Sequence, residues 1–138
     1  MTVLVDTAIW SLSLRRRATD LSPLERRLTR NLYELVQEYQ VRLLGPIRQE
    51  VLSGIREESQ FARVREHLRG YTDVELDSSD YEEAARASNL CRRSGVASSP
   101  VDCLMCAVAL RYDWQIFTTD RDFIHYAKVL PIQLFQLS

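Results

Sequence analysis

The chain has 138 residues, of which 46% are hydrophobic, so it is long enough to bury one core and too short for two. We therefore expect a single domain over residues 1–138. The formal net charge of −1 excludes binding of nucleic acid through bulk positive charge, and no apolar run approaches the length of a membrane span. Since the cysteines are odd in number and the N-terminal residues lack the features of a signal peptide, we expect a cytoplasmic protein.

Arginine carries almost all of the basic charge, and its planar guanidinium can bind two phosphate oxygens at once. Several arginines are close neighbours in the sequence: Arg15–Arg17, Arg26 to Arg30, Arg63 to Arg69, and Arg92–Arg93. Two interpretations remain open for each group. The arginines contact a nucleic-acid backbone, or they form a solvated helix face that pairs with nearby glutamates.

The first strand is expected at Thr2–Val5, a β-rich run that ends at an aspartate. Residues 22–25 form a capping box with proline at the first helical position, which predicts a helix to about Gln40. The apolar residues expected on its buried stripe are Leu24, Leu28, Leu35, Val36 and Tyr39. A second strand at Val41–Leu44 is stopped by Gly45, and apolar residues at every fourth position then predict a helix that carries Glu50 beside its buried stripe.

The second half of the chain continues the alternation of strands and helices. In chain order, we expect a helix from Phe61 to Leu68 closed by Gly70, an extended stretch at Val74–Leu76, a helix capped at Ser79 and ended by Gly95, a helix capped at Ser99 and running to about Tyr112, a strand at Gln115–Thr118, a helical turn at Asp122–Ala127 and a strand at Ile132–Leu137. The alternation predicts an α/β fold with a parallel sheet.

Four acidic residues stand where such a fold would bring them together. Asp6 and Asp120 each follow a predicted strand, and ligand sites of parallel sheets lie beyond the carboxyl ends of strands. Glu50 and Asp102 are expected near the starts of helices that line the same crevice. Carboxylates that converge in this way repel one another unless a cation neutralises them, and oxygen ligands favour Mg²⁺ or Mn²⁺. Taken singly, each acid is equally consistent with an ordinary turn or helix residue.

The motifs around these acids are Val5-Asp6-Thr7, Arg48-Gln49-Glu50-Val51, Pro100-Val101-Asp102-Cys103-Leu104-Met105-Cys106-Ala107 and Thr118-Thr119-Asp120-Arg121-Asp122-Phe123. Together and in this order they resemble the four acidic motifs of the PIN-domain ribonucleases, and the compact length is most similar to the VapC toxins of toxin–antitoxin pairs. The resemblance spans essentially the whole chain. It implies a PIN-like three-layer fold, in which helices flank a mainly parallel central sheet. The cysteines and methionine after Asp102 depart from the smaller residues common there, which affects packing more than chemistry.

The resemblance also implies a function and a set of site residues. The implied activity is Mg²⁺- or Mn²⁺-dependent hydrolysis of RNA phosphodiester bonds by a homodimeric toxin that a cognate antitoxin protein blocks. The residues implied to be catalytic and to hold the metal are Asp6, Glu50, Asp102 and Asp120. Asp122 is an additional candidate ligand, and Thr118 is implied to orient Asp6 through its hydroxyl.

Two other interpretations of the acidic residues remain. A phosphatase with an aspartate nucleophile also begins with a strand that ends in aspartate, but that class needs a second acid two residues later, and position 8 is alanine. It also needs a lysine in the later strands, whereas the one lysine is Lys128. A catalytically silent PIN-like module that binds RNA or a partner is the non-enzymatic alternative, and a complete set of acids counts against it.

Overall fold

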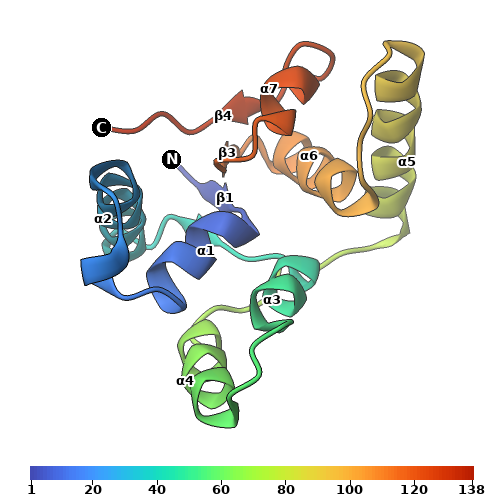
Figure 1. Ribbon diagram of the computed structural model, residues 1–138. Coiled ribbons are helices and arrows are strands. Elements are labelled where there is room, and N and C mark those ends of the chain that lie inside the picture. The colour runs from blue at the N-terminus through green and yellow to red at the C-terminus, as the bar shows by residue number, and fades with distance from the viewer.

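A four-stranded, all-parallel sheet forms the centre of the molecule in the computed structural model, which describes residues 1–138 (Figure 1). The strands are β1 (Val3–Val5), β2 (Val41–Arg42), β3 (Gln115–Phe117) and β4 (Gln133–Leu134), in the spatial order β2-β1-β3-β4. Helices on either side of this sheet complete the α/β architecture, which confirms the fold class expected from the sequence (Figure 1). All three residues of β1 are fully buried, as expected for a central parallel strand.

Seven α-helices and one short 3₁₀ turn connect the strands. They are α1 (Thr7–Leu14), the 3₁₀ turn Ala18–Asp20, α2 (Pro23–Gln37), α3 (Gly45–Leu52), α4 (Glu58–Leu68), α5 (Ser78–Arg93), α6 (Pro100–Tyr112) and α7 (Asp122–Tyr126). None of them is both long enough and apolar enough to cross a membrane.

The predicted helix starts at α2 and α6 are confirmed. Ser22 and Glu25 exchange the two hydrogen bonds of a capping box, at 3.1 and 2.9 Å, and the hydroxyl of Ser99 accepts a hydrogen bond from the amide of Asp102. Both helices begin with a proline that needs no hydrogen-bond partner at that position. Local sequence alone therefore fixes where Asp102 stands in its helix.

Helix α1 was not expected from the sequence. Its residues lack a polar face, since Ile9 and Trp10 are buried and the remaining side chains are mostly small or apolar, so no amphipathic pattern marks them. The helix begins because Asp6, directly after β1, accepts a hydrogen bond from the amide of Thr7 and so caps its N-terminus.

Several predicted details were wrong. Helix α2 ends at Gln37, and the outer members of its predicted stripe, Leu24 and Tyr39, are 57% and 88% exposed. Tyr39 has a φ of 57°, outside any helix. Helix α5 is capped by Asp77 rather than Ser79, because the Asp77 carboxylate accepts the amide hydrogen bonds of its first turn. The last strand is shorter than Ile132–Leu137, since only Gln133 and Leu134 pair with β3.

The helical hairpin of α5 and α6 packs one side of the core. From Cys103 to Ala109, every residue of α6 is buried, and Cys91, Cys103 and Cys106 are unpaired thiols within this packing. Burial raises the pKa of the Cys106 thiol above its ordinary value, which keeps it protonated. The cysteines therefore behave as small apolar side chains.

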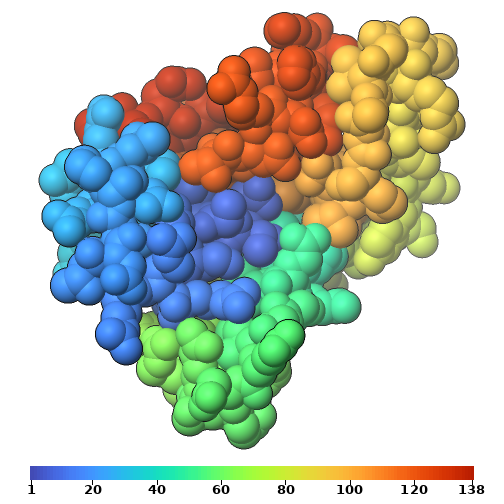
Figure 2. Space-filling model, in the orientation of Figure 1, coloured from blue at the N-terminus to red at the C-terminus, as the bar shows by residue number.

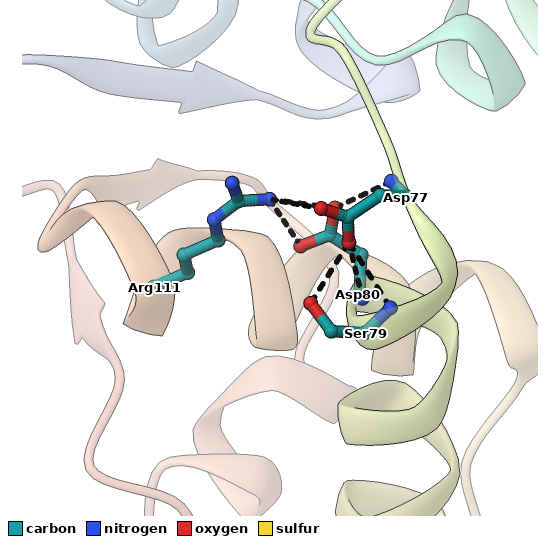
Figure 3. Close-up of polar contacts among 4 residues, drawn as sticks. All are labelled: Asp77, Ser79, Asp80 and Arg111. Atoms are coloured by element: carbon teal, nitrogen blue, oxygen red, sulfur yellow. Dashed lines mark hydrogen bonds and ion pairs between the residues drawn. The ribbon is translucent and has the colours of Figure 1, made fainter.

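A buried carboxylate joins the two helices of this hairpin (Figure 3). Asp80 on α5 is 2% exposed and accepts hydrogen bonds from Nη1 of Arg111 on α6, at 2.9 and 2.7 Å. The same carboxylate accepts the backbone amide of Asp77 at 2.9 Å, which completes a capping box. One aspartate thus links the start of α5 to the last turn of α6.

We predict that Asp80→Ala lowers the free energy of unfolding by about 2 kcal/mol, because it removes one half of the capping box and the partner of the Arg111 guanidinium. Urea denaturation measures the change. Glu83→Ala on the same helix is the matched control, since the ion pair of Glu83 with Arg86 is exposed and should contribute less than about 1 kcal/mol. Equal effects of the two substitutions would contradict the assignment of Asp80 as the link.

Candidate metal centre

The carboxyl ends of the two central strands place two predicted residues side by side. Val5 of β1 pairs with Phe117 of β3, so Asp6 and Thr118 follow neighbouring strand ends. The amide of Asp6 donates a 2.9 Å hydrogen bond to the carbonyl of Phe117, which extends the pairing by one step. Figure 2 shows the N-terminal part of the chain at the middle of the face drawn there, between α3, α6 and the segment after β3.

Hydrogen bonds fix both oxygens of the Asp6 carboxylate. Oδ1 accepts the amide of Thr7 at 2.7 Å, and Oδ2 accepts the hydroxyl of Thr118 at 2.7 Å. The Thr118 hydroxyl in turn accepts the amide of Asp120 at 2.9 Å. The structure thus shows the contact between Thr118 and Asp6 that the sequence led us to expect, and the same hydroxyl shapes the turn that carries Asp120.

Three further carboxylates lie close together. Asp102, Asp120 and Asp122 each offer one oxygen, and these oxygens all lie within 4.8 Å of one another. Asp102 is the third residue of α6, and its Oδ2 accepts a 2.7 Å hydrogen bond from the hydroxyl of Tyr126. Oδ1 of Asp120 accepts the amide of Asp122 at 2.9 Å. Asp122, which sequence analysis offered only as an additional candidate, is therefore a full member of the cluster.

Glu50 reaches the site less directly than expected. It lies in the second half of α3, not near the start of that helix, and it is exposed. Its Oε2 accepts a 2.8 Å hydrogen bond from the hydroxyl of Thr7, the residue after Asp6. Glu50 and Asp6 are both outside the group of carboxylate oxygens within 4.8 Å. The structure connects Glu50 to Asp6 through Thr7, whose amide binds Asp6 and whose hydroxyl binds Glu50.

The electrostatics of the cluster are unfavourable without a cation. Burial raises the pKa of the Asp6 carboxyl, and the charges of Asp102 and Asp120 raise it further against hydrogen bonds that lower it. Burial also raises the pKa of Asp102, with added repulsion from Asp120 and Asp122. None of the chain's ion pairs includes any of these acids or Glu50. The negative charge is thus left without a basic side chain to balance it.

The donor set fits a hard divalent cation. All the candidate ligand atoms are carboxylate oxygens, which Mg²⁺ and Mn²⁺ prefer. His67 and His125 are exposed and take no part in the group, so no nitrogen ligand favours zinc. Asp6 is buried and Asp102 half-buried, whereas Asp120 and Asp122 are exposed, so the cluster is open to solvent on one side.

Sequence reasoning did not identify two side chains that shape the site, Thr7 and Tyr126. Both are hydroxyl donors to predicted acids, at 2.8 and 2.7 Å. Thr7 lies within a motif that was quoted only for Asp6. Tyr126 lies one helical turn after Asp122, and this i, i+4 spacing is a signal that could have drawn attention to it.

Residues 3–129 match the family model of the PIN domain, and the chain belongs to this family. Among curated proteins it is 26% identical over 133 residues to a VapC ribonuclease of Mycobacterium bovis and to Ribonuclease VapC11 of Mycobacterium tuberculosis, covering 95% of this chain and 96% of either relative. Among solved structures it is similar to FitAcB from Neisseria gonorrhoeae, with a TM-score of 0.75 at 18% identity over 98% of this chain and 97% of the other. It is also similar to VapBC2 from Rickettsia felis, described as bound to a promoter DNA fragment, with a TM-score of 0.74 at 11% identity over 100% of both chains.

The cluster predicts how stability depends on charge. Asp102→Asn should raise the melting temperature of the metal-free protein at pH 7 by a few degrees, because it removes one of the repelling charges. A raised pKa means that the folded protein holds this proton more tightly than the unfolded chain, so the penalty is present at neutral pH. The advantage of the variant should therefore shrink as the pH falls toward about 4, where Asp102 becomes protonated in both states.

Thermal melts with a chelator and with Mg²⁺ measure both effects. Mg²⁺ should raise the melting temperature of the unmodified protein more than that of Asp102→Asn, because a ligand of the folded state stabilises it by mass action. Glu82→Gln, an exposed acid on α5, is the control and should respond to Mg²⁺ like the unmodified protein. Equal Mg²⁺ responses of all three proteins would mean that the carboxylates do not share a cation.

Proposed function

We propose that this chain is a divalent-cation-dependent endoribonuclease, the toxin of a VapBC-type toxin–antitoxin pair. The observation that carries the proposal is the convergence of Asp102 with Asp120 and Asp122, beside the buried carboxyl of Asp6 and without any basic partner. Membership of the PIN family and the ribonuclease names of the relatives support it. The buried, unpaired cysteines suit the reducing cytoplasm expected from the sequence.

The chain's own residues would divide the work as follows. Asp102, Asp120 and Asp122 would hold Mg²⁺ or Mn²⁺, and Asp6 would add its negative charge from the buried side of the cluster. A cation bound there supplies activation of a water for in-line attack and offsets charge on the scissile phosphate. Thr118 would keep Asp6 in place, and Glu50, oriented by Thr7, would accept a hydrogen bond from a water or from the substrate at the open side.

The phosphatase interpretation loses its support in this arrangement. Ala8 offers no second acid beside Asp6, and both oxygens of Asp6 accept hydrogen bonds, which lowers their nucleophilicity. Lys128 is exposed and pairs with none of the acids. A silent binding module remains the alternative that an assay separates from a nuclease.

A cleavage assay tests the proposal. Asp6→Asn, Asp102→Asn and Asp120→Asn should each reduce RNA cleavage by at least roughly a hundredfold while the fold is kept, because the amide retains the shape and loses the charge that holds the cation. A chelator should abolish cleavage by the unmodified protein, and added Mg²⁺ or Mn²⁺ should restore it. Glu83→Gln is the control and should cleave normally. Unchanged cleavage in the chelator would refute a metal-dependent mechanism, and RNA that is bound but never cut would favour the binding module.

We propose different roles for two of the arginine groups, based on a groove in which Arg16 also pairs with Glu25 at 3.7 Å. Its volume is about 650 Å³, and its lining includes Ala8, Arg15, Arg16 and Thr119, the last of which directly precedes Asp120. An RNA strand whose phosphate lies at the acids could therefore reach Arg15 and Arg16 with a neighbouring phosphate. Arg92 and Arg93 instead occupy the last turn of α5, where a positive charge is favourable in any helix.

The double variant Arg15→Gln with Arg16→Gln should weaken RNA binding and reduce the slope of log affinity against log salt by about 1 to 2, because one or two phosphates are no longer neutralised by the protein. Fluorescence anisotropy with a labelled RNA, measured at several salt concentrations, gives both values. The matched control is Arg92→Gln with Arg93→Gln, which removes the same charge from a helix end. An equal weakening in the two double variants would show a general charge effect instead of a specific contact.

The same charge distribution indicates how an antitoxin would block the site. Since no arginine or lysine of this chain pairs with the clustered acids, a basic side chain of a partner could take the place of the cation and so block the site. A structural relative from Klebsiella pneumoniae is described as a toxin–antitoxin complex, which supports a partner of this class. The homodimer is proposed on the family resemblance.

A further inference from the structure

Helix α7 touches the acidic cluster at both of its ends. Its first residue is Asp122, whose amide is bonded to Oδ1 of Asp120. Its last residue is Tyr126, whose hydroxyl donates to Oδ2 of Asp102 on a different helix at 2.7 Å. The ring of Tyr126 is 2% exposed and packs edge-on against Phe123, with 5.0 Å between ring centroids. The hydroxyl that binds Asp102 therefore belongs to a buried side chain whose orientation is restrained by packing.

We propose that Tyr126 is a positioning residue, which holds Asp102 where it shares a divalent cation with Asp120 and Asp122. The inference rests on the proposed function and extends it to a residue that contacts neither the cation nor the substrate. Asp102 is repelled by Asp120 and Asp122, and it is only half-buried, so its carboxylate needs a restraint to remain in the group. The Tyr126 hydroxyl supplies this restraint.

The chemical nature of the donor matters. Asp80, the other restrained aspartate at the α5–α6 hairpin, is paired with a guanidinium that cancels its charge. A neutral hydroxyl orients Asp102 and leaves its negative charge for a cation. A purely structural role of Tyr126 would depend on the ring, whereas the positioning role depends on the hydroxyl. Tyr126→Phe separates the two roles, because it keeps the ring and removes only the hydroxyl.

The experiment compares Mn²⁺ binding to the full chain and to two variants, with free Mn²⁺ followed by electron paramagnetic resonance. Tyr126→Phe should bind Mn²⁺ roughly tenfold more weakly than the unmodified protein, the usual effect of removing a hydrogen-bond partner of a metal ligand. Its RNA cleavage should be reduced at low Mn²⁺ and should recover at saturating Mn²⁺. Tyr71→Phe is the control, since the ring of Tyr71 packs against Trp10 with 5.1 Å between centroids and its hydroxyl bonds to no other group of the chain. It should bind Mn²⁺ normally.

Each outcome has a distinct meaning. Normal Mn²⁺ affinity of a folded Tyr126→Phe would overturn the positioning role and leave the proposed function standing. Absence of Mn²⁺ binding by the unmodified protein would overturn the proposed function and this inference together. Melting temperatures in a chelator establish that each variant is folded.

If Tyr126→Phe does not fold, the inference is tested by fluorine NMR of the otherwise unmodified chain. With 3-fluorotyrosine at the six tyrosines, one resonance should shift when Mg²⁺ is added, and this shift should be absent from Asp102→Asn. Unchanged tyrosine resonances on addition of Mg²⁺, in a protein that binds Mn²⁺, would overturn the inference and leave the proposed function standing.

Discussion

The constraint on which this structure depends is that several carboxylates lie close together and have no basic side chain to pair with. Asp6, Asp102, Asp120 and Asp122 repel one another, and desolvation adds to the cost for the first two. Neutral donors hold the carboxylates in place: two hydroxyls and two backbone amides bind them, and no guanidinium or ammonium does. Neutral donors fix the orientation of the carboxylates without cancelling their charge, so the repulsion among them remains.

A small number of strands and helices place these carboxylates. Parallel pairing of β1 and β3 sets Asp6 beside Thr118, and the cap at Ser99 sets Asp102 in the first turn of α6. The long contact between α5 and α6, fastened by Asp80 and Arg111, supports the helix that carries Asp102 (Figure 3). Helices and strands position side chains more precisely than loops do, and Asp120, which lies in a turn, is held there because its amide binds the hydroxyl of Thr118.

Sequence reasoning identified the elements with strong local signals. A capping box marked α2, a capping serine marked α6 and a proline marked both, and the strand ends marked Asp6 and Asp120. It missed α1, whose apolar residues on all sides carry no helical period, and it misplaced Glu50 relative to its helix. It also did not identify Tyr126: the i, i+4 spacing from Asp122 places this residue near the acids, but the contact with Asp102 joins two helices across 24 positions and depends on how α7 packs. Long-range contacts of this kind have no local pattern.

Our central claim is that the carboxylates of Asp102, Asp120 and Asp122 share one cation. The most direct measurement is an anomalous difference map from crystals of this chain grown with MnCl₂. Our account predicts a manganese peak bounded by oxygens of Asp102, Asp120 and Asp122, at distances of about 2 to 2.3 Å, which is absent from crystals of Asp102→Asn. A well-ordered cluster without a peak at that position, or a peak that persists in the variant, would contradict it.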